Sequence, residues 1–131
     1  MPNTKKYTNH SVDEIDIYLC KIKKQIEKEN FIVPATNKRA DNQNFINNYH
    51  LTTKKQKNML MQLEATDFCY SADDYNNKIE KHYIFAKEYE LDFWGSISNI
   101  LVYIKIVQKE DNFVVVISFH EAKKNVKYLF K

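Results

Sequence analysis

The hydrophobic period of the sequence changes near residue 80, and this change limits the possible folds more than any other feature. Before it, apolar residues recur at the three- and four-residue spacing of amphipathic helices. After it, three segments rich in β-branched and aromatic residues follow the two-residue period of strands: 82–89, 99–108 and 113–120. We therefore expect an α+β domain, in which helices at about 11–71 pack on one face of an antiparallel sheet of three to four strands at about 82–130. The 131 residues suit a single domain, 1–131.

The clearest helix is predicted at 11–29. Ser11 and Glu14 have the spacing of a capping box, in which each side chain accepts a hydrogen bond from the other residue's backbone. An apolar stripe follows at helical spacing: Ile15, Leu19, Ile22 and Ile26. Pro34 then favours an extended chain at the residue before it, so the helix ends ahead of this point.

Two further helices are predicted, a weaker one at 40–49 and another at 51–63, where Thr52 or Thr53 can cap the first turn. The same spacing gives their inward residues: Phe45, Ile46, Tyr49, Met59, Leu60 and Leu63. One short turn of helix is expected at 67–70.

The composition excludes several classes of site. The single glycine, Gly95, rules out glycine-rich phosphate loops. The two cysteines have no CxxC spacing and the four histidines complete no zinc pattern, so we expect neither metal nor cofactor. The chain has no apolar signal core and no run of membrane-spanning length, which predicts a cytoplasmic protein without a membrane partner. Its net charge is +3, and only one of its 20 basic residues is an arginine, so base reading by arginine is not expected.

The last two predicted strands form a hairpin if residues 109–112 make the loop. Gln108 then lies opposite Phe113, and the inward pairs are Ile104 with Ile117, Val102 with Phe119, and Ile106 with Val115. The other face gathers Tyr103, Lys105, Ser118 and His120. From the preceding strand we expect Lys87 to join this face, together with Phe85 and Tyr83.

A phenol, two ammonium groups and an imidazole beside aromatic rings suit the cleavage of RNA without a metal. Histidine transfers protons near neutral pH, lysines stabilise developing phosphate charge, and exposed aromatic rings stack on unpaired bases. Each of these residues is also an ordinary solvent-facing residue of a sheet, and only their convergence on one face favours a site.

Three segments resemble landmarks of a known family: "LTTKKQKNMLMQLEATDFCYS", "VYIKI" and "VVVISFHEAKK". They are similar to the MqsR-type toxins, which are small bacterial mRNA interferases with a RelE-like fold. The resemblance implies metal-independent cleavage of single-stranded mRNA, restraint by a cognate antitoxin protein, and no DNA contact except through an antitoxin complex.

The resemblance also implies roles for individual residues. Tyr103 and Lys105 match the family's strand tyrosine and lysine, whereas His120 and Tyr70 stand where the family has lysines. The family's strand glutamine has no counterpart, and Lys87 is expected to occupy its neighbourhood. The segment 89–99 looks like an elaboration of the family pattern.

The leading hypothesis is therefore an endoribonuclease toxin. Its catalytic residues would be His120 as acid or base, Tyr103 as its partner in proton transfer, and Lys87 and Lys105 as stabilisers of phosphate charge. The predicted RNA-binding residues are Tyr70, Phe85, Ser118, Lys123 and Lys124. The alternative is a non-catalytic inhibitor, encoded by a phage or plasmid, that binds a nucleic acid or a protein. An antitoxin or transcription factor is less favoured, because no helix-turn-helix pattern is evident.

Overall fold

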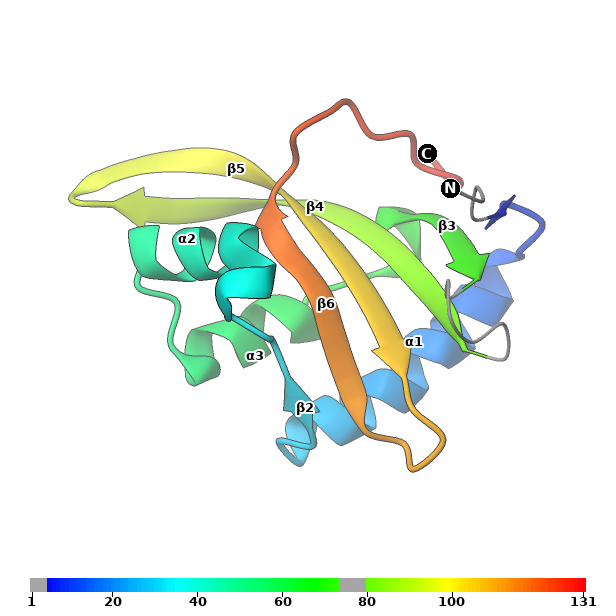
Figure 1. Cartoon of the computed structure of the whole chain (residues 1–131). Coiled ribbons are helices and arrows are strands. Elements are labelled where there is room, and N and C mark those ends of the chain that lie inside the picture. The colour runs from blue at the N-terminus through cyan, green and yellow to red at the C-terminus, as the bar shows by residue number, and fades with distance from the viewer. Residues whose placement is uncertain (1–4, 74–79) are drawn as a thin grey trace.

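The computed structural model of the protein describes residues 5–73 and 80–131, and three α-helices cover one face of its curled six-stranded sheet (Figure 1). The helices are α1 (Val12–Glu27), α2 (Ala40–Asn48) and α3 (Thr53–Met61). The strands are β1 (Lys6–Tyr7), β2 (Phe31–Ile32), β3 (Phe68–Asp73), β4 (Lys81–Phe93), β5 (Ser96–Gln108) and β6 (Val114–Glu121). Single 3₁₀ turns span Asn37–Arg39 and Ala65–Asp67.

The sheet is larger than predicted and is mixed rather than antiparallel. Its strand order is β1-β3-β4-β5-β6-β2, and β2 runs parallel to β6 while the other neighbours are antiparallel. The α+β class is confirmed. The two additional edge strands, β1 and β2, have only two residues each, so they are too short to show a period in the sequence.

The third additional strand, β3, corrects the helical turn predicted at 67–70. The helical turn ends at Asp67, and the strand begins at Phe68. Phe68 is buried among the helices, whereas Cys69 belongs to a smaller apolar cluster on the other side of the sheet. A short segment buried on both faces lacks alternation between apolar and polar residues, which is why its period is ambiguous.

Helices α1 and α3 confirm their predicted caps, and all three helices confirm their predicted inward residues. In α1, the Glu14 backbone N–H donates to Ser11 Oγ at 3.1 Å, and the Ser11 N–H donates to Glu14 Oε1 at 3.3 Å. Thr52 caps α3 by accepting from the Lys55 N–H. The predicted apolar residues of all three helices lie in or against the main core, between the helices and the sheet.

Strands β4 and β5 form a hairpin that is longer than predicted and includes the segment 89–99. Phe93 lies opposite Ser96, so Trp94 and Gly95 make a two-residue turn. Both turn residues have positive φ, 53° and 91°, as type I′ turns require. The chain's single glycine therefore occupies a position that disfavours most other residues.

The predicted register of the β5–β6 hairpin is wrong near its loop. Gln108 lies opposite Val114 instead of Phe113, so the connection is one residue longer than the predicted 109–112. Val114 and Val116 consequently face the core, in place of Val115 and Ile117. Residues 113–117 are all apolar, so hydrophobicity alone did not distinguish the predicted register from the observed one.

A β-bulge in β6 then restores the predicted orientation of the residues that follow it, although not their predicted partners. The pairing shifts between Val116 and Ser118, and Ile117 is the additional residue. Beyond the bulge Phe119 faces the core, as predicted, and is fully buried. Its neighbours Ser118 and His120 therefore face the opposite side of the sheet.

The side chain of Asn42, on α2, holds the bulged part of β6. Its amide donates to the carbonyls of Pro34 at 2.8 Å and Ile117 at 2.9 Å, and its oxygen accepts from the Phe119 N–H at 2.8 Å. Asn42 is only 1% exposed. Strand β2 ends at Ile32, so Asn42 serves as hydrogen-bonding neighbour for β6 where β2 no longer can.

We expect Asn42→Ala to destabilise the fold by about 2–3 kcal/mol, because it leaves buried backbone groups without partners. Urea unfolding followed by circular dichroism measures this loss. Asn47→Ala is the matched control, because Asn47 lies exposed on the same helix. Equal stability of the two variants would contradict the role given to Asn42.

Candidate functional site

The sheet face opposite the helices carries Tyr70, Tyr103, Lys105, Ser118 and His120, and we call it the tyrosine–histidine face. Tyr103 lies opposite His120, and Lys105 lies opposite Ser118. Side chains directly opposite one another in an antiparallel pair share a face. The predicted gathering of Tyr103, Lys105, Ser118 and His120 on one face is therefore confirmed, although they pair in a different register from the predicted one.

A cavity of about 670 Å³ lies on this face, beneath the residues that follow β6. Every residue from 122 to 129 lines it, and the sheet contributes Tyr70, Tyr103 and His120. Its basic lining residues are Lys6, Lys123, Lys124 and Lys127. Both ends of the described chain thus contribute cations to a cavity with an aromatic floor.

The C-terminal segment, residues 122–131, arches across the sheet toward the N-terminal end of the chain (Figure 1). It begins with a hydrogen bond from the Ala122 N–H to the Leu101 carbonyl at 2.8 Å. It is fixed again where the Leu129 N–H donates to the Phe68 carbonyl at 3.0 Å. Residues 128–130 form no strand, and Leu129 and Phe130 pack against the main core.

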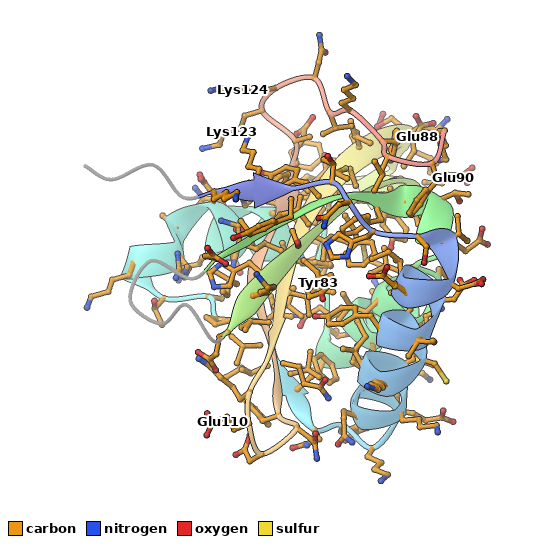
Figure 2. The ribbon with its side chains drawn as sticks, turned by 90° about the vertical axis from the view of Figure 1, so that its right-hand side faces the viewer. Tyr83, Glu88, Glu90, Glu110, Lys123 and Lys124 are labelled. Carbon is orange, nitrogen blue, oxygen red and sulfur yellow. The ribbon has the colours of Figure 1, made fainter. Side chains whose placement is uncertain are left out.

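Ion pairs fasten the same segment on both sides. Lys123 Nζ lies 2.6 Å from Asp41 Oδ2 on α2, and this hydrogen bond lowers the pKa of the Asp41 carboxyl. Lys131 Nζ lies 3.7 Å from Asp67 Oδ1. Figure 2 shows Lys123 and Lys124 projecting outward from the segment, well away from Glu88 and Glu90.

Tyr70 and Tyr103 bring their hydroxyl groups together in the cavity floor. The two oxygens are 3.5 Å apart. Burial raises the pKa of Tyr103, and the hydrogen bond with Tyr70 raises it further. The Tyr103 phenol therefore stays protonated at neutral pH, where it can donate a hydrogen bond but cannot act as a base.

His120 stacks on Tyr103, with ring centroids 5.6 Å apart and an interplanar angle of 21°. Its Nδ1 is 2.9 Å from the backbone carbonyl of Glu121. A carbonyl only accepts hydrogen bonds, so Nδ1 carries the hydrogen and Nε2 has the lone pair in the neutral ring. This arrangement assigns Nε2 as the nitrogen able to accept a proton.

His120 also lines a second, smaller cavity of about 260 Å³, which lies against α2. Asn44, Asn48 and Tyr49 contribute to it, and the two cavities share His120, Ala122 and Lys123. An extended ligand can therefore lie on both sides of the imidazole.

Lys87, Phe85 and Tyr83 do not join the tyrosine–histidine face, which corrects the prediction. Ala86 is the residue of β4 opposite Tyr103, so strict alternation sends its neighbours to the helix-covered face. Phe85 is fully buried there and cannot contact RNA. Tyr83 stacks on Tyr18, with ring centroids 3.8 Å apart.

Lys87 has a structural partner on that face. Its Nζ lies 3.1 Å from Oδ2 of Asp67, a carboxylate that is buried. The same oxygen accepts from the Glu64 N–H at 2.9 Å. Removing the lysine would leave a buried charge with less compensation, so its place in the molecule is explained without catalysis.

The remaining predicted residues differ in their relation to the cavity. Tyr70, Lys123 and Lys124 line it, whereas Lys105 and Ser118 lie one pair further along the same face. The lining residues Lys6 and Tyr128 were missed by sequence reasoning. They come from opposite ends of the chain, and no local pattern links them.

A second group of residues is linked by hydrogen bonds like a catalytic triad, but its serine is not accessible to a substrate. His10 Nε2 is 2.8 Å from Ser71 Oγ, and His10 Nδ1 is 3.2 Å from Glu14 Oε2. The hydrogen bond from His10 is the main cause that lowers the pKa of Glu14. Ser71 is 0% exposed, so no substrate reaches its hydroxyl, and the three residues instead connect the start of α1 to β3.

No model of a known protein family matches the chain, and no curated protein matches it significantly. Within residues 5–73 and 80–131, no three His, Cys, Asp or Glu side chains are grouped so that they could hold a metal ion. None of the helices in this part of the chain has the length and apolar character needed to cross a membrane.

The two cysteines should differ strongly in reactivity. Burial raises the pKa of Cys69 to about 11, so only about one molecule in a thousand carries its thiolate at pH 8. Cys20 is exposed on α1. We expect iodoacetamide at pH 8 to modify Cys20 alone in the folded protein and both cysteines in urea, as measured by mass spectrometry. Rapid modification of Cys69 in the folded state would contradict its burial beneath the C-terminal segment.

Proposed function

We propose that the protein is an endoribonuclease that cleaves single-stranded mRNA without a metal ion. The observation that carries the proposal is the position of His120. Its imidazole, oriented by the Glu121 carbonyl, lies at the junction of two cavities and beside a protonated tyrosine. In the wider proposal, which rests on the family resemblance, the protein is a cytoplasmic toxin of the RelE-like type that a cognate antitoxin neutralises.

The larger cavity supports the binding of a single strand. Lys6, Lys124 and Lys127 supply positive charge for phosphates, and Tyr70 and Tyr128 supply ring surface on which unpaired bases stack. Lysines bind phosphate as point charges and do not read bases in the paired manner of arginine. Any preference for particular nucleotides would therefore come from other groups.

Such groups lie in the smaller cavity. Asn44 and Asn48 are one helical turn apart on α2 and both are exposed. Their amides can donate to and accept from the edge of a base. In this proposal the RNA strand extends from the larger cavity, past His120, to the two asparagines of the smaller cavity. The phosphate that is cleaved then lies at the imidazole.

The proposed reaction uses His120 Nε2 to take the proton of the ribose 2′-hydroxyl. The 2′-oxygen attacks the adjacent phosphorus, the bond to the 5′-oxygen breaks, and a 2′,3′-cyclic phosphate forms. The leaving 5′-oxygen takes up the proton held by the imidazolium, directly or through water. The Tyr103 hydroxyl donates to a phosphate oxygen as its charge grows, and Lys105 adds positive charge on the same face.

A non-catalytic binding protein is the second candidate. It is favoured by one observation: Lys105 lies outside the lining of the cavity and Lys87 pairs with Asp67 on the other face, so neither lysine predicted to stabilise phosphate charge lines the cavity beside His120. In this candidate the same lysines and tyrosines hold a nucleic acid without cleaving it.

Incubation of the protein with labelled single-stranded RNA in EDTA separates the two candidates. We expect fragments that end in a 2′,3′-cyclic phosphate, and His120→Ala should lower the cleavage rate by about 10²–10⁴ because it removes the acid–base group. RNA that is shifted on a gel but stays intact would support the binding protein instead.

His50→Ala is the matched control for this experiment. His50 is exposed and packs beside Trp94 at the tip of the β4–β5 hairpin, and it does not line either cavity. Full activity is expected for it. Both variants should have the wild-type circular dichroism spectrum, and growth arrest on expression should be lost only for His120→Ala. If His120→Ala keeps full activity, the role of His120 is wrong.

The lysines of the C-terminal segment should contribute to affinity through salt-dependent contacts. If Lys124 and Lys127 each neutralise one phosphate, replacing both with alanine should reduce the slope of log K against log salt by about 1.4. Fluorescence anisotropy with a labelled oligonucleotide measures this slope. The control replaces Lys21 and Lys24, which are exposed on α1, and it should leave the slope unchanged; an equal effect would indicate diffuse attraction.

A further inference from the structure

The outer part of the β4–β5 hairpin extends beyond its neighbours in the sheet (Figure 1). Strand β3 pairs with β4 only as far as Phe85, and β6 pairs with β5 only from Val102. Among the residues that the structure describes, no strand lies along Lys87–Phe93 or along Ser96–Leu101. This part of the hairpin is therefore a two-stranded ribbon with two open edges, an arrangement that is marginally stable by itself.

The hydrogen-bonding pattern shows which backbone groups these edges present. In a two-residue hairpin Phe93 and Ser96 bond to each other, and the bonding pairs then alternate along the ribbon. The N–H and C=O groups of Ile97, Asn99 and Leu101 consequently face away from β4. The Ala122 N–H bonds to the Leu101 carbonyl, which agrees with this pattern.

The ribbon also exposes apolar side chains near its tip. Trp94 is 74% exposed, Ile97 is 64% exposed and Phe93 is 43% exposed. Phe93 lies on the helix-covered side, beside Tyr49, and the next residues on that side toward the base of the ribbon, Leu91 and Tyr89, are buried. Neighbouring exposed apolar residues beside an open strand edge are characteristic of an interaction surface.

The two open edges differ in charge. Along β4 the residues with outward backbone groups are Glu88, Glu90 and Asp92, and all three are acidic. Along β5 the stretch Ser96–Ile100 contains no charged residue, no proline and no bulge. A second copy paired along β4 would bring carboxylates together, whereas pairing along β5 meets no such repulsion.

We propose that two copies of this chain associate by antiparallel pairing of their β5 edges, with the two-fold axis beside Ile97. This register follows from the space available. Strand β6 occupies the edge from Val102 onward, and pairing Ile97 with Ile97 of the second copy places the partner's turn beside Ile100, short of β6.

The pairing joins the two sheets into one, brings the two Ile97 side chains into contact at the axis, and bonds the outward groups of Ile97 to each other. The two-fold axis is perpendicular to the sheet, so both tyrosine–histidine faces lie on the same side of the dimer. The inference does not depend on the proposed function, since none of the interface residues lines either cavity.

Disulfide trapping tests the register directly. In a bonded antiparallel pair the Cα atoms are about 5.5 Å apart, which is within the range that a disulfide spans. In a Cys20→Ser background we expect Ile97→Cys to form a covalent dimer under mild oxidation. The control, Glu90→Cys, lies on the opposite edge at an exposed position and should stay monomeric on a non-reducing gel.

Light scattering tests the association itself, without any engineered cysteine. The wild-type protein should have twice the 15.7 kDa mass of one chain at micromolar concentration. Ile97→Lys places two ammonium groups at the axis and should give a monomer with an unchanged circular dichroism spectrum, whereas Glu90→Lys should remain a dimer.

Three outcomes would overturn the proposal: a monomeric wild-type protein, a dimer that survives Ile97→Lys, or equal trapping of the two cysteine variants. If the hairpin instead binds a different protein, the wild-type protein alone will be monomeric, which is the first of these outcomes. RNA cleavage plays no part in these measurements, so failure of the proposed function would leave their interpretation unchanged.

Discussion

The arrangement of the tyrosine–histidine face depends on the hydrogen bonds that the Asn42 side chain makes to β6. Strand β2 pairs with β6 for two residues and then ends, and the bulge at Ile117 follows immediately. Without a partner at this point, the backbone groups of Ile117 and Phe119 would be buried and unsatisfied. Asn42 satisfies both, and the bulge then directs Phe119 into the core and His120 to the opposite face.

The cavity on that face is built from parts that are distant in the sequence. Its floor comes from β3, β4, β5 and β6, its rim includes Lys6 of β1, and its cover is the C-terminal segment. Two carboxylates, Asp41 and Asp67, hold the ends of this cover through lysines. Of the lining lysines, Lys123 is engaged by Asp41, so a phosphate that binds it competes with an existing ion pair.

The β4–β5 hairpin combines a covered inner side with an open outer end. Tyr89 and Leu91 fix its base against the helices, and the Tyr89 hydroxyl donates to the Met59 carbonyl. Beyond this base, the chain has neither charge nor proline to protect the β5 edge. In the proposed dimer, pairing with a second copy protects that edge and leaves the cavities accessible on one side of the joined sheet.

The sequence by itself determined the helices and the nature of the last strands, because capping residues and the 3.6-residue period are local signals. Ser11 with Glu14, and Thr52, are examples whose positions the structure confirms. The sequence also predicted that Tyr103, Lys105, Ser118 and His120 share a face. Its register is one residue off at the loop end, and the bulge adds a second residue, which restores the predicted faces.

Only the tertiary structure decided the rest, for reasons that are not local. The β4–β5 register places Lys87 and Phe85 on the helix-covered face, and the sequence did not show this because the lysine lies there only through its ion pair with Asp67, which is 20 residues earlier in the chain. The two-residue strands β1 and β2 exist only through their partners in the sheet. The cover of the cavity likewise depends on contacts between chain ends, which no pattern within a short segment encodes.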